Sequence, residues 1–251
     1  MKKINDWKRE HFKQPLNNPF LFYVVFGEFD VDFKLSGGEY QTKGIPDGID
    51  LMKYGAESNP EVFDSFLEGP IWDKFKKDDL TLAKQTKVTK ECYIFRGSVC
   101  DTNNLNYYRD LIGMITYLID NGGVAVYDLQ VYTFWSKRDW KEKIFEPRTP
   151  QPRRHVRIIY SDEENGTKWF HTRGLRKYGR PDLSIHNVSK EKEKSIIDLI
   201  NRIIEFQAKG GIVDKSFSID VKTLPQTIWF EPRGDFEDPD FNNKHIEINW
   251  E

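Results

Sequence analysis

The chain has 251 residues, of which 38% are hydrophobic and 14% aromatic, and its formal net charge at pH 7 is −2. Such a chain can bury a substantial core and is too aromatic for a disordered protein, and no apolar run approaches the ~20 residues of a membrane span. The N-terminus lacks the apolar region of a secretion signal, and Cys92 and Cys100 are too few for a disulfide framework, so we expect a cytoplasmic protein.

The first part of the chain predicts one long strand and several short helices. Residues 4–13 can form a short amphipathic helix. The run at 20–35 is first continuously apolar and then strictly alternating, which indicates a strand buried on both faces at its start and on one face at its end. Asn59 and Pro60 are typical of a helix start. Short helices are predicted at 60–67, 71–76 and 79–86.

The middle of the chain predicts a strand, a long helix and a second strand. Residues 91–99 are rich in β-formers. Apolar residues recur at helical spacing over 103–121, after the capping residues Asp101 and Thr102. Residues 124–135 predict the second strand. Because these elements follow one another with tight connections, we expect one βαβ unit with two parallel strands.

The last part of the chain predicts strands around a second long helix. Ser136 caps a short helix, and a proline-rich connector follows it over 146–152. Asn165 and Gly166 mark the turn of a hairpin. Strands are predicted at 155–160, 168–171, 183–188, 217–221, 228–230 and 245–250.

These elements define the fold class as α+β. We expect mixed sheets covered by two long helices, at about 103–121 and 190–209, each ended by a Gly-Gly pair. We expect a single compact unit over 1–251 that consists of two packed halves, 1–146 and 153–251.

Lys and Arg outnumber Asp and Glu between residues 137 and 180, although the chain as a whole is acidic. Glycine lets backbone N–H groups approach an anion, and arginine offers a fork that matches phosphate or carboxylate. We therefore predict a surface over 153–180 that binds an anionic small molecule, an acidic protein or nucleic acid. Its predicted contacts are Arg154, Arg157, Arg173, Gly174, Arg176, Lys177, Gly179 and Arg180.

Two features should distinguish this site from a plain hairpin end. We expect Gly174 or Gly179 to have a positive φ, and at least three cations to converge on one solvent-accessible concavity. In the alternative, the arginines of a solvated hairpin pair with the acids near them, which are Asp162, Glu163, Glu164 and Asp182.

A rival hypothesis is an acid–base enzyme that acts on a phosphate or acyl substrate. The sequence contains no P-loop, nucleophile elbow, zinc-protease or dinucleotide motif. This excludes the enzyme classes that such motifs identify, but not enzymes in general. His171 or His155 would carry the proton, and Asp128 or Asp182 would orient the histidine. Asp128 interrupts an apolar strand, where a charge needs a partner. A structural or partner-inhibiting role is a third hypothesis.

The histidines could also form a metal site. His155, His171 and His186 would do so only if three neighbouring strands brought them together, and a strand histidine is more often a packing residue. The acids at 235–240 lack the spacing of a calcium loop. We therefore predict no metal and no cofactor.

Two stretches resemble a known group of proteins. They are Y-R-D-L-I-G-M-I-T-Y-L-I-D-N-G-G-V-A-V-Y-D-L-Q at 108–130 and W-F-H-T-R-G-L-R-K-Y-G-R-P-D-L-S-I at 169–185. The group consists of uncharacterised bacterial proteins classified as domains of unknown function, and the resemblance covers roughly residues 90–190. It implies a bacterial cytoplasmic protein of α+β type. It implies no reaction, so it assigns no catalytic residue.

Overall fold

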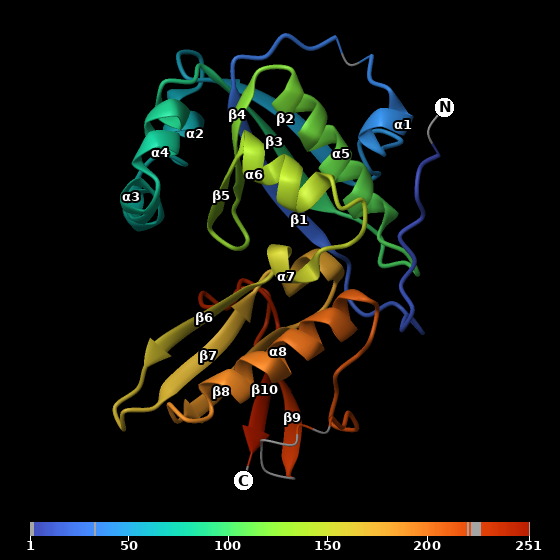
Figure 1. Cartoon of the computed structure of the whole chain (residues 1–251), viewed down its shortest axis with the longest axis vertical. Helices are drawn as coiled ribbons and strands as arrows, with labels where there is room; N and C mark the ends of the chain where they lie inside the picture. The colour runs from blue at the N-terminus through green and yellow to red at the C-terminus, as the bar shows by residue number, and fades with distance from the viewer. Residues whose placement is uncertain (1–2, 33, 220, 222–226, 251) are drawn as a thin grey trace. The chain divides into compact units, whose positions relative to one another are not determined.

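The computed structural model of the chain describes residues 3–32, 34–219, 221 and 227–250. The chain forms two compact units, and neither is one continuous segment (Figure 1). The first consists of Met1–Trp7, Leu21–Val99 and Leu105–Pro150, and the second of Lys8–Phe20, Cys100–Asn104 and Gln151–Glu251. Two short early segments therefore belong to the second unit, although most of that unit comes from the last hundred residues.

The first unit is built on a five-stranded sheet with the strand order β2-β3-β1-β4-β5. The strands are β1 (Phe20–Gly27), β2 (Ile49–Gly55), β3 (Glu91–Ser98), β4 (Gly123–Asp128) and β5 (Thr133–Ser136). The helices are α1 (Gly37–Tyr40), α2 (Pro60–Asp64), α3 (Gly69–Asp78), α4 (Leu80–Lys87), α5 (Asn106–Asp120) and α6 (Lys137–Trp140), which a π-helical turn, η1 (Lys141–Phe145), extends.

Both faces of this sheet are covered, which explains the continuous apolar run in β1. Successive side chains of a strand point to opposite faces. The hydroxyl of Tyr23 lies 2.6 Å from that of Tyr108 in α5, whereas Val24 packs in a cluster with Phe63 of α2. A buried strand between two helical layers therefore needs apolar side chains at every position.

The predicted strand–helix–strand succession is present, but its two strands are not neighbours. β1 lies between β3 and β4 and pairs antiparallel with β4. The single strand expected at 124–135 is also two strands, because the chain reverses between Asp128 and Thr133, which face each other across the β4–β5 pair. Tyr132 takes a positive φ of 54° in this turn. Neither glycine nor proline occurs there to mark the turn in the sequence.

The second unit also has a five-stranded sheet, with the order β6-β7-β8-β10-β9. β8 and β10 are parallel and the other pairs antiparallel, so the sheet is mixed. The strands are β6 (Arg157–Asp162), β7 (Lys168–Arg173), β8 (Asp182–Val188), β9 (Ile228–Arg233) and β10 (His245–Trp250). The helices are α7 (Pro152–His155), the 3-10 turn η2 (Leu175–Tyr178) and α8 (Glu193–Ala208).

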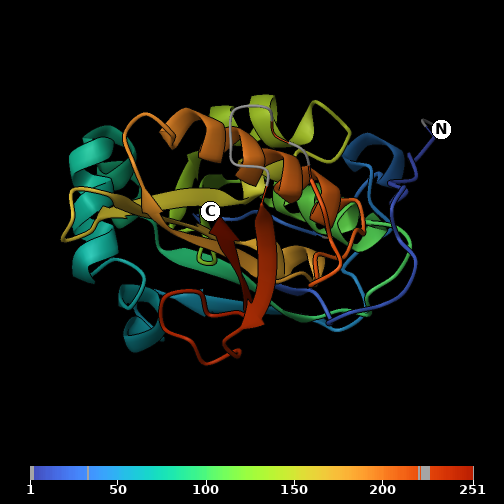
Figure 2. The same ribbon diagram turned by 90° about the horizontal axis from the view of Figure 1, so that it is seen from below.

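The helix α8 lies along one side of this second sheet (Figures 1 and 2). Its apolar stripe is fully buried, and so are the apolar side chains that alternate along the strands. Those strand residues are Phe170, Leu183, Ile185, Ile246 and Ile248. Two open sheets with long helices confirm the predicted α+β class. No helix among the described residues is long and apolar enough to cross a membrane.

Several predicted boundaries are wrong. Residues 4–13 form no helix, because the backbone N–H groups of Arg9 and His11 donate to Asn103 and Lys209, at 3.0 and 2.9 Å, instead of to their own segment. The strand predicted over 20–35 ends at Gly27. At 217–221, the described residues 217–219 and 221 are not in a strand, and residue 220 lies outside the described residues.

Candidate functional site

The basic segment of the second unit turns inward. Arg173, Lys177 and Arg180 are only 4%, 0% and 1% exposed. Gly174 and Gly179, on either side of η2, have φ values of 116° and 66°, which confirms the predicted backbone conformation. The turn is tight for a steric reason, since a Cβ on Gly179 would lie 2.1 Å from the carbonyl oxygen of Asn17.

The charge of Arg180 is balanced inside the unit by a carboxylate from a distant segment. Its Nη1 lies 2.7 Å from Oδ2 of Asp101, and Nη1 of Arg9 lies 2.5 Å from Oδ1 of the same carboxylate. All three side chains are fully buried. We call Arg9, Asp101 and Arg180 the buried triad. The guanidinium groups also donate to main-chain carbonyls, which are those of Tyr178, Ala208, Gly210 and Gly211.

The other cations of the segment are also held by main-chain oxygens. Lys177 donates to the carbonyl of His155 at 2.8 Å, and Arg173 donates to that of Asp240. Arg176 donates to Asn242 at 2.8 Å. The sequence predicted that at least three of these cations converge on an exposed concavity, but Arg173, Lys177 and Arg180 are buried instead. Arg154 is exposed on α7, and Arg157 is half-buried opposite Arg173.

The two aspartates proposed to orient a histidine have other partners. Asp182 is buried and accepts hydrogen bonds from Thr172, Asn243 and the amide of Leu175, at 2.8, 2.8 and 3.2 Å. Burial raises the pKa of Asp182 to about 6, against the lowering effect of those bonds. Asp128 belongs to the first unit, where it accepts from the amide of Gln130 at 3.2 Å.

The structure separates His155 from the other predicted histidines and adds one that the sequence analysis left out. His155 ends α7 instead of starting a strand, and burial, followed by the charge of Lys177, lowers its pKa well below the usual value. His171 and His186 both stack on Trp169, with ring centroids 4.2 and 5.1 Å away. The additional histidine is His245, and the ring of Phe241 contacts both His245 and His171.

These rings lie on the sheet face that does not carry the buried aliphatic residues. We call this surface the histidine face and define it as Trp169, His171, His186, Phe241 and His245. One row of directly paired residues, which includes His171, crosses all five strands on this face. That row is Ile159, His171, Ser184, Glu247 and Glu231.

His186 is the exposed member of the histidine face, and its imidazole is held from several sides. Its Nδ1 lies 2.7 Å from Oε1 of Glu163, and its ring is parallel to that of Trp169 within 3°. The side chain is 44% exposed. Burial alone would raise the pKa of Glu163, but hydrogen bonds from His186, Asn187 and Thr167 lower it below the usual value. This carboxylate is thus charged and orients the ring.

His171 and His245 are the less exposed members. Burial lowers the pKa of His171 to about 4, with Asp240 acting in the opposite direction. Burial likewise lowers the pKa of His245, whose Nδ1 is 3.7 Å from Oδ2 of Asp238. Nδ1 of each ring is buried without a hydrogen-bond partner among the described residues. Both rings are therefore neutral at pH 7.

The low pKa of His171 gives the first testable prediction. We expect its imidazole to titrate near pH 4 in NMR spectra of the folded protein, because burial disfavours the charged form. The folded-state pKa is below the unfolded value of 6.5, so the contribution of His171 to stability should be lost as the pH falls from 6.5 through 4. The His171→Gln variant should lack this part of the pH dependence. A midpoint above pH 6 would contradict the buried environment.

No group of His, Cys, Asp or Glu in the described ranges is arranged to hold a metal ion. What the face offers to a ligand is ring surface, imidazole nitrogens and carboxylate oxygens.

Fold and site together define an α+β protein whose second unit presents a ring-lined polar sheet face. Residues 156–215 match the family model described as "Protein of unknown function (DUF4026) C-terminal". The matched segment runs from β6 to just past α8 and contains Trp169, His171 and His186. Over this segment the chain is similar to a group of domains of unknown function, in line with the resemblance. Comparison with curated proteins and with solved structures gives no match.

Proposed function

We propose that the chain is a binding protein whose histidine face takes a small organic cation, that is, a ligand with an amine or guanidinium group. The observation that carries this proposal is a carboxylate beside each histidine. Glu163 is hydrogen-bonded to His186, and Asp238 lies near His245. The charge of Asp240 opposes the lowering of the pKa of His171 by burial. Since His171 and His245 are neutral at pH 7, this charge is not cancelled by the rings.

A second pair of carboxylates supports a cationic ligand. Glu231 and Glu247 are directly opposite each other on β9 and β10. Like charges in this position repel unless a cation lies near them. Arg233 supplies a cation for Glu231, since its Nη2 lies 2.7 Å from Oε2 of that carboxylate. Aromatic rings combined with carboxylates suit ammonium and guanidinium groups, which gain both ion pairing and contact with ring surface.

The predicted phosphate-bearing or acidic ligand fits this face less well. Arg173, the basic residue nearest to His171 on its strand, is buried and donates to main-chain carbonyls. Arg233 is already paired. An anion would therefore meet carboxylates before it met an available guanidinium.

Titration with agmatine tests the proposal. We expect agmatine to shift the indole resonance of Trp169 in ¹H–¹⁵N spectra, and Glu247→Gln to weaken its binding about tenfold or more, since a hydrogen bond to a charged group contributes ~1.5–3 kcal/mol. Glu205→Gln is a matched control. It removes a paired carboxylate, 3.1 Å from Arg153, that belongs to α8, and it should leave binding unchanged.

The same titration with phosphate and with AMP provides the opposite outcome. If these anions shift the Trp169 indole and agmatine does not, the ligand is anionic and the proposal is wrong. Equal binding by the wild type and Glu247→Gln would also contradict it.

The 2.7 Å contact between Glu163 and His186 favours a second candidate function, acid–base catalysis. A carboxylate that holds one imidazole nitrogen leaves the other for proton transfer. The role would thus fall to His186, whose side chain is 44% exposed, whereas His171 is buried. Hydrolysis of p-nitrophenyl acetate and p-nitrophenyl phosphate tests it. An activity that His186→Gln lowers by about a hundredfold would support catalysis, and an unchanged rate would exclude it.

A further inference from the structure

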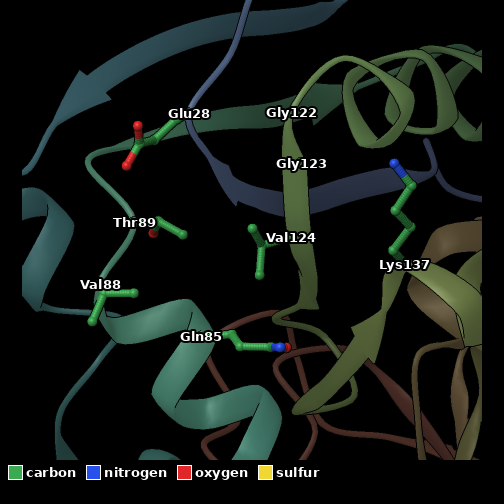
Figure 3. A pocket seen from close by; sticks show the side chains of 8 residues that line it. All are labelled: Glu28, Gln85, Val88, Thr89, Gly122, Gly123, Val124 and Lys137. Carbon is green, nitrogen blue, oxygen red and sulfur yellow. The ribbon is translucent and has the colours of Figure 1, made fainter.

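A pocket of about 490 Å³ lies in the first unit (Figure 3). Four separate elements build it, which are the end of β1, the C-terminal end of α4, the turn between α5 and β4, and the start of α6. Its lining residues are Glu28, Gln85, Val88, Thr89, Gly122, Gly123, Val124 and Lys137. The volume is within the range of sites for small molecules.

A β-bulge shapes the floor of this pocket. Phe26 is opposite Ala125 whereas Gly27 is opposite Gly123, so Val124 is an extra residue in β4. A bulge redirects the side chain of the inserted residue. Val124 accordingly packs beside the cluster of Trp72, Phe75 and Ala125, and it lines the pocket.

The turn before the bulge must be glycine. Gly122 has a φ of 110°, and a Cβ there would lie 1.9 Å from the carbonyl oxygen of Glu28. This close approach brings the end of β1 against the turn, so that Glu28 stands at the pocket wall.

The pocket has opposite charges on two sides of an apolar floor. Figure 3 shows Glu28 and Lys137 on opposite sides of Val124. Lys137 donates to the carbonyl of Ile119 at 2.9 Å and lies 4.0 Å from Oδ1 of Asp120, which holds its half-exposed ammonium at the C-terminal end of α5. Glu28 lies 3.7 Å from Lys90, and because both side chains are largely exposed this ion pair is weak and easily exchanged for another.

Val88 adds an apolar side chain to the lining of the pocket, and this side chain is exposed to water. It is 75% exposed, more than any other large hydrophobic side chain among the described residues. A ligand with an aliphatic part would cover Val88 and Val124 together and remove apolar surface from water.

We propose that this pocket binds a small zwitterion with an aliphatic body, such as a free aliphatic amino acid. The ammonium of the ligand pairs with Glu28, its carboxylate pairs with Lys137, and its side chain contacts Val88 and Val124. This inference does not depend on the histidine face, because all the residues that carry it belong to the first unit.

Titration of the full chain with L-leucine tests the pocket without any substitution. We expect millimolar leucine to shift the amide resonances of Gly122, Gly123 and Val124. N-acetyl-leucine lacks the ammonium and leucine amide lacks the carboxylate, so each should bind at least about tenfold more weakly. An absence of shifts at these three amides would overturn the proposal, as would equal binding of leucine and its two analogues.

Substitutions of Glu28 and Lys137 test which charged group of the ligand each residue binds. Glu28→Gln should weaken leucine but not leucine's N-acetyl analogue, and Lys137→Met should weaken leucine but not leucine amide. Lys90→Met is the matched control, because it removes a competitor of the ligand for Glu28 and should leave binding equal or tighter. Variants that bind like the wild type would contradict the assignment.

Discussion

Replacing Asp101 with asparagine should lower the free energy of unfolding by about 3–5 kcal/mol, the loss typical of breaking a buried ion pair at one partner. The substitution keeps the size of the side chain but leaves two guanidinium groups, those of Arg9 and Arg180, buried without their carboxylate. It also weakens the acceptor for the amide of Leu16, at 3.0 Å. Chemical denaturation followed by circular dichroism measures the loss.

Asp78→Asn is the matched control for this prediction. The carboxylate of Asp78 lies 2.7 Å from Lys74 in α3, but both side chains are 59% exposed, so its loss should cost no more than ~1 kcal/mol. A loss below ~1 kcal/mol for Asp101→Asn would show that the triad contributes little.

The excised segment 151–251 should not fold by itself, although it contains all the strands and helices that the structure describes in the second unit. It lacks Lys8–Phe20 and Cys100–Asn104, and with them Arg9 and Asp101. Arg180 would then keep its carbonyl partners but lose the carboxylate of Asp101. We expect poorly dispersed NMR spectra and no cooperative unfolding transition.

Cleavage of the folded chain gives the contrasting experiment. Limited proteolysis in the connector at 147–152 should yield two fragments that elute together in gel filtration, because the N-terminal fragment still carries residues 8–20 and 100–104. A dispersed spectrum from the isolated segment 151–251 would show that those two early segments are dispensable.

The sequence predicts the regular elements well where packing and local signals agree. The helices α5 and α8 have apolar stripes and end before glycine pairs, and β6 and β7 flank an Asn-Gly turn, so periodicity identifies all four. The helix expected at 4–13 fails because its backbone groups bond to residues 103 and 209. No local pattern reveals a partner that far along the chain.

The candidate site was predicted only in part for the same reason. The sequence marks the segment around His171 and Arg180 as unusual, but it does not reveal that Arg180 points inward, because the balancing Asp101 is 79 residues away. The alternation of side chains along β7 places Trp169 and His171 on one face. The neighbours His245 and Glu163 depend on strand order and on the fold of the hairpin, which periodicity does not determine.

The buried triad also sets an order of events during synthesis. Arg9 donates to the carbonyl of Ala208, which is 199 residues further along the chain. At translation rates of ≈ 5–20 residues per second, the N-terminal segment leaves the ribosome roughly 10–40 s before its acceptor does. Over this interval Arg9 has to remain solvated and outside any finished core. The second unit can therefore close only once nearly the whole chain has been made, and folding of this protein should be completed after, rather than during, translation.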